Sequence, residues 1–347
     1  MAFFRTPRRR RAATPPRPAC APCPSFSLPA AGKRFTIYVA AKGFERELMD
    51  EIHRARPGSV RGRRGRLVAA DGPPLDAAWA QNIWLEPVVL PIASVGEAVR
   101  SLKSIQRNWH AHPVGEFRRA ALIAAQLPPV SARPLVFGEA APASPLGAWT
   151  LWERGLLLFS ARCSSPFADG EVHFVENRTE PPSRAYLKLW EVFTLLGERP
   201  GPGQTCLDLG SSPGGWTWAL AHTGARVISV DKAGLAPQVA ALPGVDFRRG
   251  SGFGLNPAEL GRVDWLFSDM ACYPQRLLRT VRRWLEAGNA ARFVCTLKFQ
   301  GETDHDTARA FAALPGSRLL HLSCNRHELT WVCRPPQRTA SKFQRTI

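Results

Sequence analysis

A loop of small residues in the second half of the chain could hold a nucleotide-like ligand. Residues 207–216 read LDLGSSPGGW and join a strand expected at residues 205–209 to a helix expected from Trp216 onward. The loop glycines leave the backbone open to a ligand at the carboxyl edge of a sheet, where open α/β folds bind nucleotides. The loop lacks the Lys-Ser/Thr ending of a phosphate loop and the glycine spacing of the dinucleotide fingerprint. A tight strand-to-helix turn without a ligand is the alternative.

A carboxylate at the end of the next expected strand narrows the kind of ligand. Residues 226–231 read RVISVD, an apolar run that ends in Asp231. In doubly wound folds, an acid at this position binds the ribose hydroxyls of an adenosine. The glycine loop together with this acid, without phosphate-binding residues, predicts an adenosine cofactor such as S-adenosylmethionine.

Four polar residues lie at the margins of expected elements around this loop: Lys188, Asp269, Lys298 and Glu328. The first three can meet above the carboxyl edge of a parallel sheet. Glu328 begins the last expected strand, so it reaches the same edge if that strand is antiparallel, as mixed sheets allow. Each residue alone could be an ordinary surface ion pair, but together they predict a site.

Such a cluster suits the methylation of a ribose 2′-hydroxyl. This reaction needs an in-line approach to the methyl group and the loss of a weakly acidic proton. A lysine can accept a proton when burial or a neighbouring cation favours its neutral form. We expect Lys298 to be the general base or to position the hydroxyl, Lys188 to be its electrostatic partner, and Asp269 and Glu328 to orient the amines.

The elements that must position these residues divide the chain into five parts. We expect a disordered basic arm at residues 1–32, a mixed α+β module at 33–163, a linker at 164–182, an α/β domain at 183–335 and a basic tail at 336–347. In the α/β domain, strands at 205–209, 225–230, 263–267, 292–297 and 328–333 alternate with helices, including an arginine-rich one at 274–287. This order predicts a mostly parallel, Rossmann-like sheet covered on both faces.

The first module is expected to contain strands at 35–40, 88–95 and 135–137, a helix at 43–52, a basic hairpin around 61–66 and a second hairpin formed by 149–152 and 156–160.

Composition indicates which kind of partner and which cellular compartment to expect. The chain has 347 residues, a formal net charge of +18 and a pI near 10.6, which favour a nucleic-acid partner, although GC-rich coding also enriches arginine. No uninterrupted apolar run of about 18 residues occurs, so we expect no membrane span. The eight cysteines are scattered, and the lone Cys20-Ala-Pro-Cys23 pair lacks the further ligands of a zinc site. We therefore expect no metal and a reducing, cytoplasmic compartment.

The motifs resemble a known family. Asp208-Leu209-Gly210-x-x-Pro213-Gly214-Gly215-Trp216, Ser268-Asp269-Met270-Ala271 and the four-residue cluster resemble the FtsJ-type RNA ribose 2′-O-methyltransferases. Pro182-Ser183-Arg184-x-x-Leu187-Lys188-Leu189 and Asn325-Arg326-x-Glu328-Leu329-Thr330 are similar to the bacterial large-subunit rRNA cytidine 2′-O-methyltransferases of type M. The resemblance covers roughly residues 36–334 and implies an N-terminal THUMP-like RNA-binding module.

The resemblance also implies roles for individual residues. Ser212, Pro213, Gly214 and Gly215 would line the methionine part of the cofactor, Asp231 its ribose, and Asp269 the region near the sulfur, with Lys298 as the principal catalytic residue. Gly210 and Trp216 complete the predicted cofactor-binding set. The chain departs from the family pattern at Ser251, where an acid near the adenine is usual, and at Ala185, where a serine is usual.

We therefore expect a monomeric, cytoplasmic enzyme that methylates RNA, with a cytidine of 23S rRNA before or during large-subunit assembly as the target. Another RNA is an alternative substrate. A base methyltransferase is one rival, for which Cys272 is the plausibly placed nucleophile, and a catalytically idle RNA-binding or assembly factor is another. The sequence leaves open the target nucleotide, the role of the basic arm and whether Ser251 takes over an adenine contact.

Overall fold

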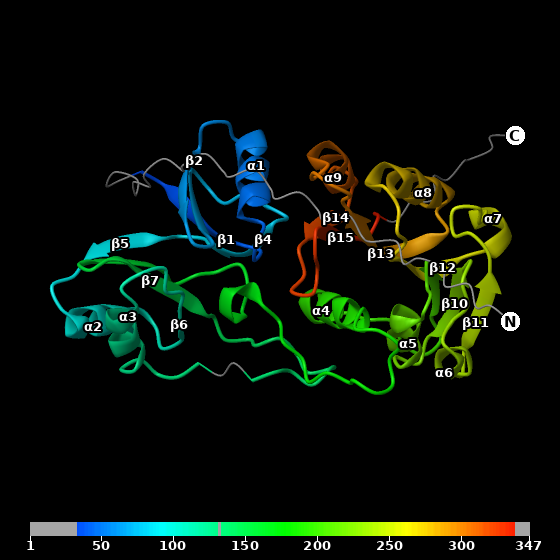
Figure 1. Ribbon diagram of the computed structural model, residues 1–347, viewed down its shortest axis with the longest axis horizontal. Coiled ribbons are helices and arrows are strands. Elements are labelled where there is room, and N and C mark those ends of the chain that lie inside the picture. Colours follow the sequence, from blue (N-terminus) through cyan, green and yellow to red (C-terminus); the bar gives the residue numbers. More distant parts are fainter. Residues whose placement is uncertain (1–32, 131–132, 337–347) are drawn as a thin grey trace, which may run out of the picture.

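The computed structural model describes residues 33–130 and 133–336, and its first half contains two four-stranded sheets (Figure 1). The expected basic arm, Cys20, Cys23 and nearly all of the expected tail lie outside the described residues. The first sheet has the order β2-β3-β1-β4, and α1 packs beside it. Its elements are β1 (Phe35–Ala40), α1 (Glu45–Ala55), β2 (Val60–Arg64), β3 (Leu67–Asp71) and β4 (Ala80–Trp84).

The second sheet has the order β5-β8-β7-β6 and carries two helices. Its elements are β5 (Val88–Pro91), α2 (Val95–Ile105), β6 (Trp109–Ala111), α3 (Phe117–Ala124), β7 (Gly147–Glu153) and β8 (Leu156–Ser160). The predicted helix near 43–52 and both predicted hairpins are confirmed, and the buried Leu48 and Ile52 mark the inner face of α1.

Two predicted strands of this half are shorter than expected. The strand expected at 88–95 ends at Pro91, because Ser94 accepts a hydrogen bond from the Glu97 N–H and so starts α2. The strand expected at 135–137 is reduced to one bridge between Leu135 and Phe174.

The second half is built on a seven-stranded sheet with the order β11-β10-β9-β12-β13-β15-β14. Its strands are β9 (Thr205–Leu209), β10 (Arg226–Asp231), β11 (Val245–Arg249), β12 (Val263–Ser268), β13 (Ala290–Lys298), β14 (Ser317–Leu320) and β15 (Glu328–Cys333). The first five in spatial order are parallel, whereas β15 runs antiparallel to both of its neighbours. The predicted Rossmann-like sheet is confirmed, and the two strands that the sequence did not predict, β11 and β14, are short and partly exposed.

Helices cover both faces of this sheet (Figure 1). They are α4 (Tyr186–Leu196), α5 (Gly215–Ala221), α6 (Pro237–Ala240), α7 (Pro257–Leu260), α8 (Pro274–Ala287) and α9 (His305–Ala312). The apolar side of α8 buries Leu277, Val281 and Trp284, while its four arginines remain exposed. In the part of the chain that the structure describes, no helix combines the length and apolar character that a membrane crossing requires.

The segment 164–182, expected to be a linker, is packed against both halves. It contains a 3₁₀ turn, η1 (Ala168–Gly170), and buries Phe167 and Val172. The Val172 N–H donates to Ser323 Oγ at 3.1 Å, which ties the segment to the loop between β14 and β15. The polar composition of this segment did not predict its packing, because the buried contacts come from only a few apolar side chains.

Candidate active site

The glycine loop after β9 has a backbone that side chains would block. Gly210 has φ +79°, and a Cβ there would lie 2.6 Å from Met270 Cγ and 2.9 Å from Met270 Cα. Gly214 has φ +115°, and a Cβ there would lie 2.9 Å from a methyl carbon of Val239. Left-handed backbone and close approach both favour glycine, so these two residues fix the shape of the loop.

Asp231 at the end of β10 is bonded directly to this loop. One carboxylate oxygen accepts a hydrogen bond from the Ser212 N–H at 3.1 Å, and the other accepts one from the Ala233 N–H at 2.9 Å. Ser212 Oγ donates to the Gly234 carbonyl at 2.8 Å. A carboxylate has further lone pairs, so Asp231 can also accept from the hydroxyls of a ligand.

The loop and Asp231 border a cavity of about 490 Å³ at the carboxyl edge of the sheet. Its lining also includes Lys232, Gly250, Ser251, Gly252, Phe253, Met270, Ala271, Arg276 and, at the reactive end, Asp269 and Lys298. This volume lies in the range of small-molecule sites. A glycine-walled cradle with a carboxylate at one end and a lysine at the other fits S-adenosylmethionine.

Lys188, Asp269, Lys298 and Glu328 meet at that edge and form an alternating chain of charges, here called the tetrad. Lys188 Nζ lies 2.6 Å from Glu328 Oε1 and 3.5 Å from Asp269 Oδ1. Lys298 Nζ lies 3.0 Å from the same Asp269 oxygen and donates to the Asp269 carbonyl at 2.6 Å. Lys298 and Glu328 are direct partners in the β13–β15 ladder, which confirms the antiparallel arrangement on which the expectation depended.

Burial separates the members of the tetrad. The side chains of Lys188 and Glu328 are 10% and 11% exposed, whereas that of Lys298 is 27% exposed and borders the cavity. Lys298 and Asp269 are therefore the members that a ligand in the cavity can contact. Lys188 contacts Asp269, and Glu328 contacts Lys188, from the more buried side.

Glu328 is held by the loop that precedes it, residues 321–327. Ser323 donates from both its N–H and its hydroxyl to the Glu191 carboxylate on α4, at 2.9–3.0 Å. Asn325 Nδ2 donates to Thr330 Oγ1 at 3.2 Å and to the Glu328 carbonyl at 3.4 Å. Burial raises the pKa of Glu191 to about 8.

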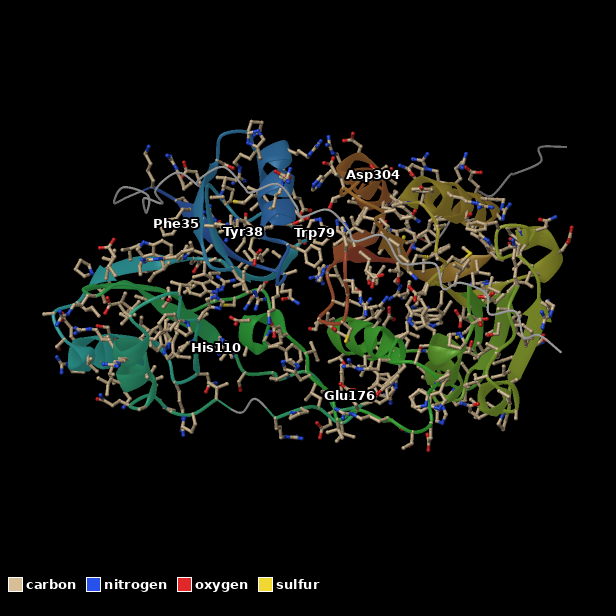
Figure 2. The ribbon with its side chains drawn as sticks, in the orientation of Figure 1. Phe35, Tyr38, Trp79, His110, Glu176 and Asp304 are labelled. Atoms are coloured by element: carbon tan, nitrogen blue, oxygen red, sulfur yellow. The ribbon has the colours of Figure 1, made fainter. Side chains whose placement is uncertain are left out.

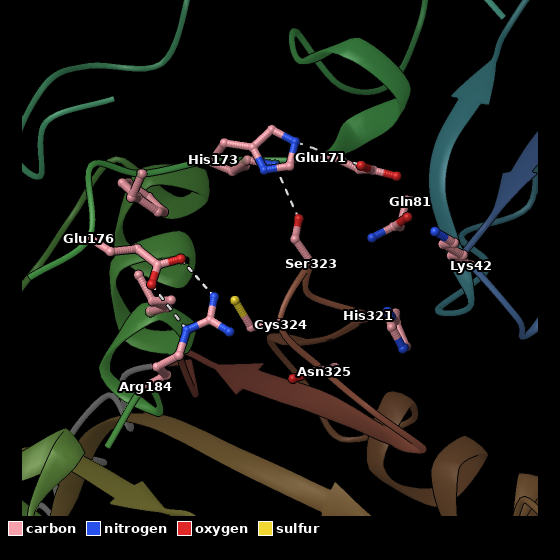
Figure 3. A pocket seen from close by; sticks show the side chains of 13 residues that line it. Lys42, Gln81, Glu171, His173, Glu176, Arg184, His321, Ser323, Cys324 and Asn325 are labelled. Atoms are coloured by element: carbon pink, nitrogen blue, oxygen red, sulfur yellow. Dashed lines mark hydrogen bonds and ion pairs between the residues drawn. The ribbon is translucent and has the colours of Figure 1, made fainter. Parts of the chain in front are cut away.

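Figure 3 shows the same loop bordering a second cavity of about 260 Å³, across from Gln81 and Lys42 of the N-terminal half. Arg184 borders this cavity and is paired with Glu176 at 2.7 Å. The loop before Glu328 is thus enclosed by α4, by segment 171–176 and by the first sheet.

Four residues of the predicted cofactor set do not line the larger cavity: Pro213, Gly214, Gly215 and Trp216. The Trp216 ring N–H donates to the Ala185 carbonyl at 2.9 Å, and the side chain is buried against Phe267. Trp216 therefore acts in packing, which its position after a glycine loop did not reveal. Contacts of the other three with the cofactor stay predictions. Gly210, Ser212, Asp231 and Asp269 do line the cavity, as does Ser251.

Sequence reasoning missed three residues near the cavity. The Arg276 guanidinium lies 3.8 Å from the centre of the Phe253 ring, and both side chains line the cavity. Asp208 is fully buried beneath the loop, where Thr217 donates to it at 2.7 Å, and burial raises its pKa to about 7. The Asp-Leu-Gly motif could have indicated Asp208, but no local pattern indicates the Arg276–Phe253 contact.

A segment that contains the glycine loop, Lys188, Asp269 and Lys298 is similar to a known family. Residues 181–314 match the model of the FtsJ-like methyltransferase family. The resemblance found in the sequence is thereby confirmed for this segment, and the family implies S-adenosylmethionine as the cofactor.

Curated relatives agree with the family match. Over 131 residues the chain is 39% identical to the ribosomal RNA large subunit methyltransferase M of Halorhodospira halophila. This match covers 37% of this chain and 38% of the relative. The chain is 36% identical over 167 residues to the protein of that name from Aromatoleum aromaticum. This match covers 44% of this chain and 45% of the relative. The chain thus spans less than half the length of the curated relatives it matches.

Proposed function

We propose that the protein is an S-adenosylmethionine-dependent RNA 2′-O-ribose methyltransferase whose substrate is a cytidine of 23S rRNA. The decisive observation is that Lys298, bound to Asp269, borders the same cavity as Asp231 and the glycine loop. The names of the relatives support ribosomal RNA of the large subunit as the substrate.

The proposed roles follow from the contacts. When bound, S-adenosylmethionine supplies an electrophilic methyl group. Asp231 would hold the cofactor ribose, and Lys298 Nζ would orient the 2′-hydroxyl of the target and take up its proton. Asp269 fixes Lys298 through both its carboxylate and its carbonyl. Lys188 holds Asp269 in place and is itself held by Glu328. Holding the reacting groups in line accounts for much of the rate enhancement in such reactions.

The RNA contacts are proposed to come from surfaces other than the predicted basic hairpin. In that hairpin Arg61 is paired with Asp71, Arg64 donates to the Trp152 carbonyl, and Arg66 lies 2.6 Å from Glu171. These arginines stabilise the module, so they are poor phosphate ligands. On α8, which begins beside the cofactor cavity, the exposed Arg279 and Arg282 are better placed to bind RNA phosphates. Arg283 of the same helix donates to the Phe253 and Leu255 carbonyls.

The domain plan belongs to the same proposal. We propose residues 33–163 as a THUMP-like RNA-binding module, 164–182 as its connection and 183–335 as the catalytic domain of a monomeric, cytoplasmic enzyme. The β-rich character of the first half supports an accessory module that presents RNA to the catalytic domain.

The test is methyl transfer from labelled S-adenosylmethionine to protein-free 23S rRNA from a strain lacking this gene, followed by nucleoside analysis. Wild-type protein is expected to yield 2′-O-methylcytidine. Lys298→Ala is expected to abolish this product, whereas Lys103→Ala, an exposed lysine on α2, retains it. A base-methylated product, or full activity in Lys298→Ala, would overturn the proposal.

The base-methylating rival depends on Cys272. This side chain is buried, and burial raises the pKa of its thiol, which disfavours the thiolate that a nucleophile needs. The idle-factor rival predicts cofactor binding without transfer to any RNA.

A further inference from the structure

A second cluster of ligand-type side chains lies in the N-terminal half, distant in sequence from the tetrad. His110 lies on β6 and His112 directly follows it, so the two are at alternate positions. Asp169 comes from η1, 57 residues further along the chain, and completes the cluster. The ligand atoms of the three side chains lie within 4.8 Å of one another. Figure 2 labels His110 beside the second sheet.

The three side chains are arranged around one carboxylate oxygen. His112 Nδ1 lies 2.7 Å and His110 Nε2 lies 3.3 Å from Asp169 Oδ1. Two ligand atoms held about 2.1 Å from a zinc ion are about 3.0 Å apart at a right angle and about 3.4 Å apart at a tetrahedral angle. The two observed separations lie close to these values, so small side-chain shifts would admit an ion.

Hydrogen bonding alone leaves this cluster incompletely satisfied. His110 Nε2 is buried and, among the described residues, forms no hydrogen bond of good geometry, although it faces Asp169. A buried polar atom without a partner is costly, and a cation between the three groups would satisfy both imidazoles at once.

The cluster is also accessible. His110 and Asp169 line a cavity of about 770 Å³, which gives an ion an entry path and leaves room for water as a further ligand.

We propose that His110, His112 and Asp169 bind a divalent transition-metal ion of the zinc class. Two imidazoles and a carboxylate are a ligand set that suits zinc, iron and cobalt. The ion would fasten η1, and with it the segment that leads to the catalytic domain, to β6. This inference departs from the expectation of no metal. No local pattern in the sequence indicates this site, because its three residues are brought together only when the chain folds.

The experiment uses the full chain carrying Cys20→Ser and Cys23→Ser, stripped of metal with a chelator and titrated with Co²⁺. One equivalent is expected to bind, with visible d–d absorption and no thiolate charge-transfer band. His112→Ala and Asp169→Asn are each expected to weaken binding at least about 10-fold. His173→Ala, a histidine of the same cavity outside the cluster, retains wild-type affinity.

Asp169→Asn keeps the size of the side chain and one acceptor oxygen for the two histidines but removes the charge, so it separates ligation from folding. The proposal also predicts that Zn²⁺ raises the melting temperature of the stripped wild-type chain but not that of Asp169→Asn. Absence of saturable Co²⁺ binding, a thiolate spectrum, or unchanged affinity in both cluster variants would overturn it and leave a hydrogen-bonded clamp.

Discussion

Replacing Lys188 by methionine tests whether the tetrad is a buried charge network rather than a set of surface ion pairs. Methionine approximates the length of the lysine side chain but removes the ammonium between Glu328 and Asp269. Because Lys188 is only 10% exposed, its loss leaves two largely buried carboxylates without that partner. Removing one partner of a buried pair costs about 3–5 kcal/mol. We expect Lys188→Met to lower the free energy of unfolding by about 3 kcal/mol and also to reduce methyl transfer.

Lys298→Met is the matched control, because this lysine is more exposed and borders the cavity. We expect it to cost about 1 kcal/mol or less in stability and to reduce methyl transfer at least about 100-fold. The assay is urea unfolding of both variants, of Glu328→Gln and of the Lys188→Met/Glu328→Gln double variant. The double variant should lose less stability than the two single changes summed. Equal stability losses in Lys188→Met and Lys298→Met, or strict additivity in the cycle, would refute the reasoning.

Three further predictions concern groups around the tetrad and the cofactor cavity. Burial raises the pKa of Glu191 from 4.5 to about 8, so the folded chain holds an extra proton between these values and loses stability as pH rises. Glu191→Gln should remove about 1.4 kcal/mol per pH unit from that dependence, measured by urea unfolding between pH 5.5 and 7.5, and an unchanged slope would contradict the assignment. Asp231→Ala should weaken S-adenosylmethionine binding about 10-fold in calorimetry, through the lost hydroxyl contact and the lost bond to Ser212, and unchanged affinity would count against this site. Cys272→Ala should retain methyl transfer, and its loss together with trapped covalent RNA in the wild type would favour base methylation.

Local patterns predicted much of the catalytic half and little of what surrounds it. The apolar runs that became β9, β10, β12, β13 and β15 are continuous because both faces of the sheet are covered, so they could be read directly. The positions of Asp231, Asp269 and Lys298 could be predicted as well, because each lies at or directly after the end of one of these strands.

The features that could not be predicted from the sequence depend on contacts between distant segments. Trp216 follows the glycine loop, as a ligand-binding residue would, yet its ring N–H donates a hydrogen bond to the Ala185 carbonyl. Asp169 lies in a segment whose polarity predicted a linker, and its contacts with His110 and His112 exist only after folding. Hydrophobic periodicity carries no information about such pairings.

The N-terminal half helps to position the tetrad. Phe299 directly follows Lys298, and His327 directly precedes Glu328. Both rings lie against Trp79 of the first half, with centroids 5.9 Å and 5.8 Å from it, and Figure 2 shows Trp79 where the first sheet meets the catalytic domain. Trp79 is almost fully buried and contacts Phe44 and His321 as well. Because the two strand ends bearing Lys298 and Glu328 are packed on one tryptophan, displacement of the N-terminal half would alter the tetrad geometry, so that half is a structural part of the candidate active site.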